Sequence, residues 1–161
     1  MAFVIVPFEK RHHQLITSLA LRAWEPVFAS LKSSLPRPIY ASIYPNGWEA
    51  RHRSEIDAVC ESPDCKLWIA EDALVPVGFA AIKFHPAERM GEIYIIGVEP
   101  RRQAEGIGSA LMSFCLERMR EAGMAIAMVD TASDPGHAPA RRTYEKAGFD
   151  LWPVARYFRE L

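Results

Sequence analysis

The stretch of sequence that decides the fold reads Val98-Glu-Pro-Arg-Arg-Gln-Ala-Glu-Gly-Ile-Gly-Ser-Ala-Leu111. An apolar segment that ends at Val98 runs into a polar loop, and the loop opens an amphipathic helix. The first turn of a helix presents free N–H groups and the positive end of the helix dipole, and both attract phosphate. Glycines at 106 and 108 let the backbone approach an anion because no side chain intervenes. The loop from Gln103 to Ser109 is therefore predicted to bind a phosphate group.

Two common phosphate-binding motifs match this stretch poorly. A P-loop requires a lysine after its second glycine, but Ser109 follows Gly108 directly. A dinucleotide-binding fingerprint requires glycine at position 111, where the chain has Leu111. Asp130 lies at the end of the next predicted strand, where a dinucleotide-binding fold has an acidic residue. A dinucleotide site is therefore not excluded by geometry alone. The motif nevertheless comes late in the chain, after strands with which a dinucleotide-binding fold does not begin.

Hydrophobic periodicity predicts the elements on either side of the loop. Strands are predicted at residues 3–6, 66–71, 75–84, 92–98 and 124–130, with two short β-like segments at 149–153 and 154–158. Helices are predicted at residues 10–24, 48–60, 106–122 and 139–147. Four prolines interrupt residues 25–47, which are predicted to be irregular with at most one short helix at 27–32.

The order of these elements predicts an α/β fold with a mixed central sheet. The strands before the phosphate loop follow one another closely and form an antiparallel meander. The strand–helix–strand order after them requires a parallel pair, with helices on both faces of the sheet. No linker or repeat divides the chain, so residues 1–161 are predicted to form one domain.

Composition limits the function further. The 161 residues carry 19 basic and 20 acidic side chains, which argues against a nucleic-acid partner. The three cysteines have no framework spacing and are predicted to be reduced thiols in a cytoplasmic protein, and the histidines form no metal-ligand pattern. The segment Met1–Pro7 lacks a basic start and a cleavage site, and no apolar run has membrane-spanning length. No membrane partner and no metal are expected.

Two motifs carry a resemblance to a known family. Gln103-x-x-Gly106-x-Gly108 resembles the (Gln/Arg)-x-x-Gly-x-(Gly/Ala) acetyl-CoA signature of the GNAT superfamily of N-acetyltransferases. Downstream, Ala140-Arg-Arg-Thr-Tyr-Glu-Lys-Ala-Gly-Phe149 resembles the Asn-x-x-Ala-x-x-x-Tyr-x-x-x-Gly-Phe segment of the same family. A helix and a strand separate the two motifs, as that family requires.

The resemblance implies acetyl-CoA as co-substrate and direct acetyl transfer to a primary amine in a ternary complex. The pyrophosphate would be bound by loop amides from Gln103, Ala104, Glu105, Gly106, Ile107, Gly108 and Ser109. The strands at 92–98 and 124–130 would splay apart, and backbone groups of Ile96 and Val98 would bind the pantetheine arm. An amide near Val98 would stabilise the oxyanion.

Two side chains are predicted to be catalytic. Glu92 lies six residues before Val98, and this even spacing predicts that both face the same side of the sheet. The resemblance extends to the histone-acetyltransferase branch and implies that Glu92 is the general base; the alternative is a solvated glutamate at a strand end. Tyr144 matches the family tyrosine that protonates the CoA thiolate; the alternative is a tyrosine that packs on the core.

His137 departs from the family pattern, which has asparagine there as a contact to the pantetheine arm. An imidazole can donate one hydrogen bond or shuttle a proton, and a loop histidine without such a role is the alternative. Four arginines are candidates for phosphate contacts or plain surface charges, namely Arg101, Arg102, Arg141 and Arg142.

The acceptor is left open by the sequence. Between Arg22 and Arg53, five aromatic side chains could bind an apolar or cationic amine or simply pack together, namely Trp24, Phe28, Tyr40, Tyr44 and Trp48. The basic excess in this region disfavours a polycationic acceptor. Acyl chain length and oligomeric state are open as well, with a homodimer as one option. The rival functions are an acyl-CoA-binding module without catalysis and a dinucleotide-binding protein.

Overall fold

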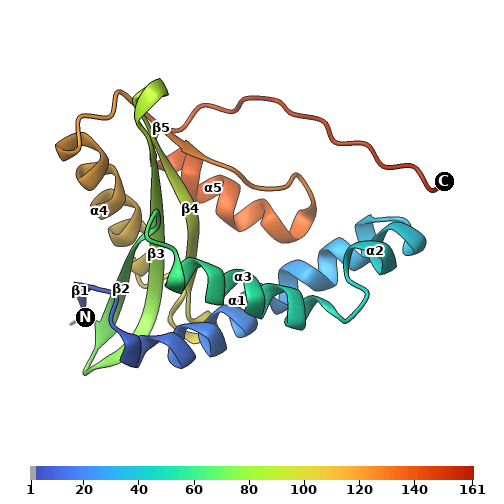
Figure 1. Ribbon diagram of the computed structural model, residues 1–161, viewed down its shortest axis with the longest axis horizontal. Helices are drawn as coiled ribbons and strands as arrows, with labels where there is room; N and C mark the ends of the chain where they lie inside the picture. Colours follow the sequence, from blue (N-terminus) through green and yellow to red (C-terminus); the bar gives the residue numbers. More distant parts are fainter. Residues whose placement is uncertain (1–2) are drawn as a thin grey trace.

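A computed structural model describes residues 3–161, and within them five strands form one mixed sheet. The strands lie in chain order, and Figure 1 shows them between helices: β1 (Val4–Pro7), β2 (Lys66–Asp72), β3 (Val75–His85), β4 (Met90–Val98) and β5 (Ile126–Val129). The first four strands pair antiparallel, and β5 pairs parallel to β4. The predicted fold class is therefore confirmed, although β4 begins earlier and β5 is shorter than predicted.

Helices cover both faces of the sheet, as predicted (Figure 1). Helices α1 (His13–Ser34) and α3 (Trp48–Glu61) pack on one face, which we call the α1–α3 face. Helix α4 (Ile107–Glu121) packs on the opposite face, the α4 face, and α5 (Ala138–Lys146) contacts the same core through Tyr144. The largest buried side chains of the two cores are Ile16, Leu19, Ile56, Ile69 and Phe79 on one face, and Ile82, Ile93, Ile107, Leu111 and Met112 on the other.

The prediction that residues 25–47 are irregular is wrong. Helix α1 continues through Pro26 to Ser34, and α2 spans Arg37–Ile43. Pro36 is the N-cap of α2 and Pro38 lies in its first turn, where a missing N–H removes no helical hydrogen bond. These two prolines mark a helix start. The packing of the buried Phe28 outweighs the break expected at Pro26.

The two β-like segments predicted after residue 148 do not form. Residues 149–161 are in no strand, and most of their large apolar side chains are exposed. A strand requires a partner ladder, and Pro153 removes a backbone donor from the middle of this segment. Figure 1 shows the segment running away from the sheet beyond α5.

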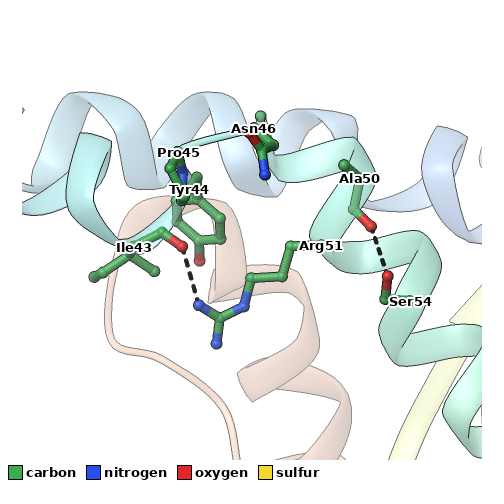
Figure 2. Close-up of a pocket in the computed structure, with 8 residues that line it drawn as sticks. Ile43, Tyr44, Pro45, Asn46, Ala50, Arg51 and Ser54 are labelled. Atoms are coloured by element: carbon green, nitrogen blue, oxygen red, sulfur yellow. Dashed lines mark hydrogen bonds between the residues drawn. The ribbon is translucent and has the colours of Figure 1, made fainter.

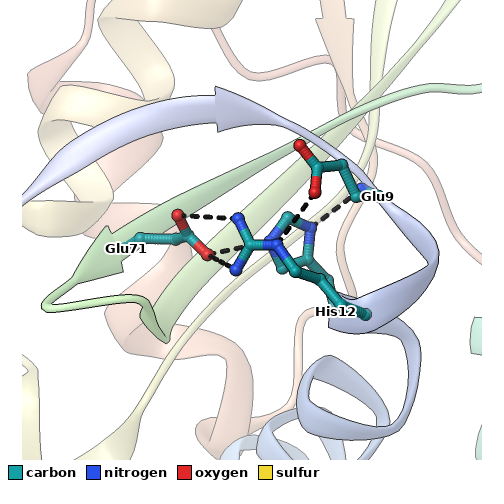
Figure 3. A network of polar contacts seen from close by, with 4 residues as sticks. Glu9, His12 and Glu71 are labelled. Carbon is teal, nitrogen blue, oxygen red and sulfur yellow. Dashed lines mark hydrogen bonds and ion pairs between the residues drawn. The ribbon is translucent and has the colours of Figure 1, made fainter.

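A buried polar network anchors the start of α1 to β2 (Figure 3). The Glu71 carboxylate accepts hydrogen bonds from Arg11 Nη1 at 2.6 Å and from His12 Nε2 at 2.8 Å. The backbone amide of Glu9 donates to His12 Nδ1 at 2.8 Å, so the ring proton of neutral His12 is on Nε2. The hydrogen bond from Arg11 holds the pKa of Glu71 below its usual value despite burial, with His12 contributing in the same direction.

The three cysteines are free thiols, and burial raises the pKa of Cys60 and Cys115 to about 12 in each case. Such thiols stay protonated and unreactive at neutral pH. Within residues 3–161, no helix combines the length and the apolar character that a membrane crossing requires. In the same part of the chain, no group of three or more His, Cys, Asp or Glu side chains is placed to bind a metal ion.

Candidate functional site

The predicted phosphate loop opens α4 with unpaired backbone amides. Gly106 is the N-cap of α4 with φ of 84°, a left-handed conformation that favours glycine, and no side chain caps the helix. The first helical hydrogen bond runs from Ala110 N to Gly106 O at 2.9 Å. The amides of the residues before Ala110 have no intrahelical acceptor, namely Gly106, Ile107, Gly108 and Ser109. Free amides at the start of a helix are the arrangement that favours anions in proteins.

The protein's own packing leaves space beside the two glycines of the loop. A Cβ atom added at Gly106 would meet no atom within 4 Å. One added at Gly108 would lie 3.6 Å from Val98 Cγ2, which is ordinary van der Waals contact. The backbone conformation accounts for Gly106, but packing does not account for Gly108. The open space therefore leaves room for a ligand at the loop.

Side chains of the loop are held by neighbours. Arg102 Nε donates to Glu105 at 2.6 Å, and Arg102 Nη1 donates to Asp72 at 2.9 Å. These bonds raise the pKa of Arg102. They also engage the guanidinium of a residue that the sequence made a candidate for contacts to phosphate. Gln103 Nε2 donates to the carbonyl of Val98 at 3.4 Å, which joins the loop to the end of β4.

Strand β4 continues beyond the end of β5. The parallel pairing stops at Ile93 and Val129, whereas β4 runs on to Val98 (Figure 1). The amide of Glu99 donates to Val77 O on the β3 side at 3.0 Å. Because N–H directions alternate along a strand, the amides of Val98 and Ile96 point to the side from which β5 is missing. The predicted splay between the two strands is present, and these amides border it.

A β-bulge in β4 overturns one prediction about Glu92. Ile82 faces Ile93 and Ala81 faces Ile95, so Tyr94 has no partner on β3. The extra residue reverses the alternation of side chains along β4. Ile93 before the bulge and Val98 after it both pack in the α4-face core. Glu92, next to Ile93, therefore lies on the α1–α3 face, and its predicted position on the same face as Val98 is wrong.

Glu92 is held by a histidine that sequence reasoning left unassigned. Its Oε2 lies 2.7 Å from His85 Nε2, and the carboxylate is 17% exposed. Lys83 is its register partner on β3, and Lys83 Nζ lies 3.4 Å above the ring of Tyr94. Only the antiparallel register of β3 and β4 reveals this charged group, because seven residues separate His85 from Glu92 along the chain.

Tyr144 lies on α5 and packs against the α4-face core. Its ring meets Phe149 edge-on with a centroid distance of 6.2 Å. Burial raises the pKa of Tyr144 above its usual value, so the phenol keeps its proton at neutral pH. The group is therefore chemically able to donate a proton to a basic leaving group.

His137 belongs to a polar cluster that joins two distant elements. It ends the 3-10 turn η4 (Pro135–His137), and its Nδ1 is hydrogen-bonded to Asp134 Oδ1. Asp134 Oδ2 accepts from Ser30 Oγ of α1 at 2.7 Å and from the amide of Gly136 at 3.0 Å. Burial alone would raise the pKa of Asp134, but the hydrogen bonds from Ser30 and His137 outweigh it, and the pKa lies below its usual value.

Sequence reasoning missed Asp134, the partner of His137, and Ser30, which bonds to Asp134 in turn. The Asp-x-x-His spacing of the loop was a visible signal for Asp134. Ser30 is 104 residues from Asp134 and carries no signal. Arg141 donates to the carbonyls of Ala132 and Asp134 at 2.7 and 2.9 Å, so this guanidinium holds the same loop.

The predicted acceptor aromatics pack mainly on one another. Phe28 stacks on Trp48 with a centroid distance of 4.5 Å and meets Tyr44 edge-on at 5.4 Å. Trp24 lies 4.9 Å from the ring of His52, and a Cβ atom at Gly97 of β4 would be 2.6 Å from Trp24 Cζ3. The cluster thus reaches from α3 to the part of β4 that borders the splay.

A separate depression of about 230 Å³ lies between the end of α2 and α3 (Figure 2). Arg51 Nη1 donates to the carbonyl of Ile43 at 3.1 Å, and its guanidinium lies over the ring of Tyr44. The lining includes Tyr44 of the predicted acceptor aromatics, but none of the predicted catalytic or CoA-binding residues. The depression is therefore separate from the phosphate loop and from the predicted catalytic residues.

Comparisons with known proteins agree with this geometry. Residues 34–149 match the model of the acetyltransferase (GNAT) family. The mycothiol acetyltransferase of Thermomonospora curvata is 35% identical over 88 residues, which are 55% of this chain and 29% of the relative. That of Nocardia farcinica is 32% identical over 108 residues, or 64% of this chain and 35% of the relative. The chain thus spans about a third of the length of the curated relatives it matches.

Solved structures share the fold over nearly the whole chain. The aminoglycoside N-acetyltransferase AAC(6')-Iy in complex with CoA has a TM-score of 0.68 at 15% identity and covers 99% of this chain and 95% of its own. The PaiA N-acetyltransferase of Thermoplasma acidophilum in complex with coenzyme A has a TM-score of 0.70 at 15% identity, with 96% and 94% coverage. With the family match over most of its length, the chain belongs to the acetyltransferase (GNAT) family.

Proposed function

We propose that the protein transfers an acetyl group from acetyl-CoA to a primary amine by direct attack in a ternary complex. The observation that carries this proposal is the position of two sets of unpaired amides. Those at the start of α4 suit a pyrophosphate, and those of Ile96 and Val98 border the opening between β4 and β5. A linear cofactor with an anionic end and an amide-bearing arm complements both sets.

The loop residues then bind CoA mainly through their backbone. The amides that bind the pyrophosphate are those of Ala104, Glu105, Gly106, Ile107, Gly108 and Ser109. The amide of Gln103 donates to the carbonyl of Pro100 at 3.4 Å, so Gln103 supports the loop through its side-chain bond to Val98. Ile96 and Val98 pair with the pantetheine arm in place of the missing β5 ladder, and His137 contacts the arm from η4. An amide at Val98 donates to the thioester oxygen as negative charge develops there.

The chemistry requires three proton movements. At neutral pH the acceptor is an ammonium group, which loses one proton before attack and a second when the nitrogen becomes an amide. Between these losses the nitrogen forms a bond to the thioester carbon, and the C–S bond breaks. The thiolate takes a proton from Tyr144. Glu92, with His85 beside it, takes one of the two protons from nitrogen.

The acceptor proposal rests on the names of the relatives and on charge. The matched relatives are mycothiol acetyltransferases, and a structural neighbour is an aminoglycoside N-acetyltransferase. These names support the amine of a small molecule as the acceptor. Basic residues outnumber acidic ones between Arg22 and Arg53, which favours a neutral or singly charged acceptor over a polycation. Free thiols support a cytoplasmic location.

Release of CoA from acetyl-CoA in the presence of a monoamine, an amino sugar, an aminoglycoside and a lysine peptide tests the proposal. With the best of these amines, Tyr144→Phe should lower kcat by roughly 10²-fold because the thiolate loses its proton donor. The affinity for CoA should change little. Tyr157→Phe is the matched control, because Tyr157 is 90% exposed and makes no part of the site.

Two results would contradict the proposal. If CoA binds tightly but none of the amines is acetylated, the domain is an acyl-CoA-binding module. If NAD binds and CoA does not, the loop serves a dinucleotide.

A further inference from the structure

We infer that His137, oriented by Asp134, is a second proton acceptor of the reaction, taking at Nε2 the proton from nitrogen that Glu92 does not take. The inference rests on the proposed acetyl transfer. Asp134 does not touch substrate and is a positioning residue. The family pattern has asparagine at this position, which can hydrogen-bond but cannot accept a proton at neutral pH.

The hydrogen bonds of Asp134 determine which nitrogen of His137 is basic. Oδ2 accepts from Ser30 Oγ and from the amide of Gly136, and Oδ1 faces His137 Nδ1. An ionised carboxylate only accepts hydrogen bonds, so Nδ1 must carry the ring proton. Nε2 of the neutral ring therefore has a free lone pair. The same carboxylate stabilises the imidazolium that forms when Nε2 takes a proton, as in carboxylate–histidine pairs of hydrolases.

The support behind His137 is rigid. Ser30 Oγ donates to Asp134 and accepts from the amide of Gly136 at 2.9 Å. A Cβ atom at Gly136 would lie 2.6 Å from Ser30 Cβ, so the turn lies directly on α1. Arg141 on α5 is the charged side chain that also holds this turn, through two backbone carbonyls. Such locked supports are what a proton-transfer group requires.

The turn η4 lies after the strand that borders the splay. The turn follows β5 at the end where its pairing with β4 has stopped. His137 is the N-cap of α5, and Tyr144 lies seven residues later, about 10 Å farther along the helix axis. The side chain of His137 is 17% exposed, so it is accessible without being freely solvated. The base and the thiolate acid thus belong to one continuous segment, η4 and α5, that follows β5.

The step conserves protons. Nε2 of neutral His137 takes H⁺ from the attacking nitrogen, and the imidazolium pairs with the Asp134 carboxylate. Glu92 takes the other nitrogen proton, and Tyr144 gives one to sulfur. Tyr144 is reprotonated from solvent, and both bases release their protons to solvent. The reaction releases one net proton for each ammonium group converted to an amide.

His137→Asn tests this role because asparagine is the residue of the family pattern and preserves a hydrogen-bonding contact. With the best amine of the panel, kcat should fall at least 10-fold, while the dissociation constant of CoA changes less than threefold. On the acid side, the limiting slope of log kcat against pH should fall from two to one. Glu92→Gln should also reduce this slope to one, and the variant that combines His137→Asn with Glu92→Gln should have no acid-side slope.

Asp134→Asn tests the positioning. Without the carboxylate, the imidazolium that forms on His137 is less well stabilised, so kcat should fall roughly 10-fold or more. Multiple-bond ¹H–¹⁵N NMR of the CoA-free protein should show the proton on His137 Nδ1 in the wild type and a changed tautomer population in the variant. His13→Gln is the control. His13 Nε2 lies 2.7 Å from Asp57 Oδ1, and this similar pair is not part of the site.

The outcomes separate the two claims. Unchanged kcat and slope in a folded His137→Asn variant, or a higher CoA dissociation constant with normal kcat, would show that His137 is only a contact. A wild-type proton on Nε2 would overturn the inference even if no amine is acetylated. Absence of acetylation combined with the Nδ1 tautomer would refute the proposed function and leave the positioning by Asp134 established.

Discussion

Gly97 shows how one residue links the core to the site. It lies in β4 next to Val98, and its missing side chain leaves space for the ring of Trp24. Trp24 also lies 6.3 Å from the ring of Phe79, which is fully buried in the α1–α3 core. A glycine inside a strand weakens it, so the close approach of an aromatic ring explains this one.

Gly97→Ala should destabilise the protein and disturb the site together. The new Cβ would lie 2.6 Å from Trp24 Cζ3 and 2.9 Å from Phe79 Cε1, which forces repacking at a cost of about 1–3 kcal/mol. Displacement of Trp24 should raise the KM for the amine. Urea unfolding and acetylation kinetics measure the two effects. Gly108→Ala serves as the control for the unfolding measurement alone, because its Cβ would make an ordinary contact at 3.6 Å. Equal stability of both variants would disprove the close packing.

Helix α4 is the element that turns a sheet into a cofactor site. It begins after a left-handed glycine, Gly106, and a second one, Gly123, follows its last turn. Leu111, Cys115 and other buried side chains hold the helix against the α4 face. This packing fixes the direction of the first-turn amides toward the end of β4, and loop residues need only leave the space open.

The two glycines at the ends of α4 make a matched pair of variants. Each has φ above +75° and no atom within 4 Å of an added Cβ, so Gly106→Ala and Gly123→Ala should each cost about 1 kcal/mol of stability. Only Gly106→Ala places a methyl group beside the phosphate-binding amides. Calorimetric titration should show weaker CoA binding in Gly106→Ala alone. If both variants lose CoA affinity to a similar extent, the cause is strain in the helix and not the methyl group beside the amides.

At the scale of the whole molecule, polar links join parts that are distant in sequence. Glu71 ties β2 to the start of α1, and Asp134 ties the loop after β5 to the end of α1. Arg22 in the middle of α1 bonds to Glu99 just after β4 at distances down to 2.5 Å. Helix α1 therefore spans the sheet and places Ser30 and Trp24 at the site.

Glu71→Gln should show what the buried link contributes to stability. The folded pKa of Glu71 is lowered, so its contribution is fully present above the unfolded pKa of about 4.3 and is lost as the pH falls through the folded value. At pH 7 the variant should lose about 2 kcal/mol in urea unfolding. The difference from wild type should shrink below pH 4.

The control is Glu9→Gln. Glu9 bonds to the same Arg11 at 2.8 Å but is 62% exposed, and an exposed ion pair contributes under about 1 kcal/mol. If the Glu71→Gln variant loses no more stability than Glu9→Gln, or if its loss persists unchanged at pH 3, the charge of the Glu71 carboxylate is unimportant for stability.

Local sequence by itself determined the sheet, most helices and the phosphate loop. Apolar periodicity and the glycines at 106 and 108 act over a few residues, so the strands β2 to β4 and helix α4 were predicted with small boundary errors. The family resemblance carried by Gln103–Gly108 and Ala140–Phe149 was confirmed by the family match. The catalytic roles of Glu92 and Tyr144 stay predictions.

Tertiary structure alone decided the rest. The break expected at Pro26 was wrong because the packing of Phe28 is not a local property, whereas Pro36 and Pro38 mark a helix start that their position in α2 reveals. The bulge at Tyr94 moved Glu92 to the other face, since register depends on the partner strand. The group around His137 needs Ser30, which only folding brings to Asp134. Sequence periodicity reports which residues are buried, whereas contacts between distant elements depend on how the whole chain packs.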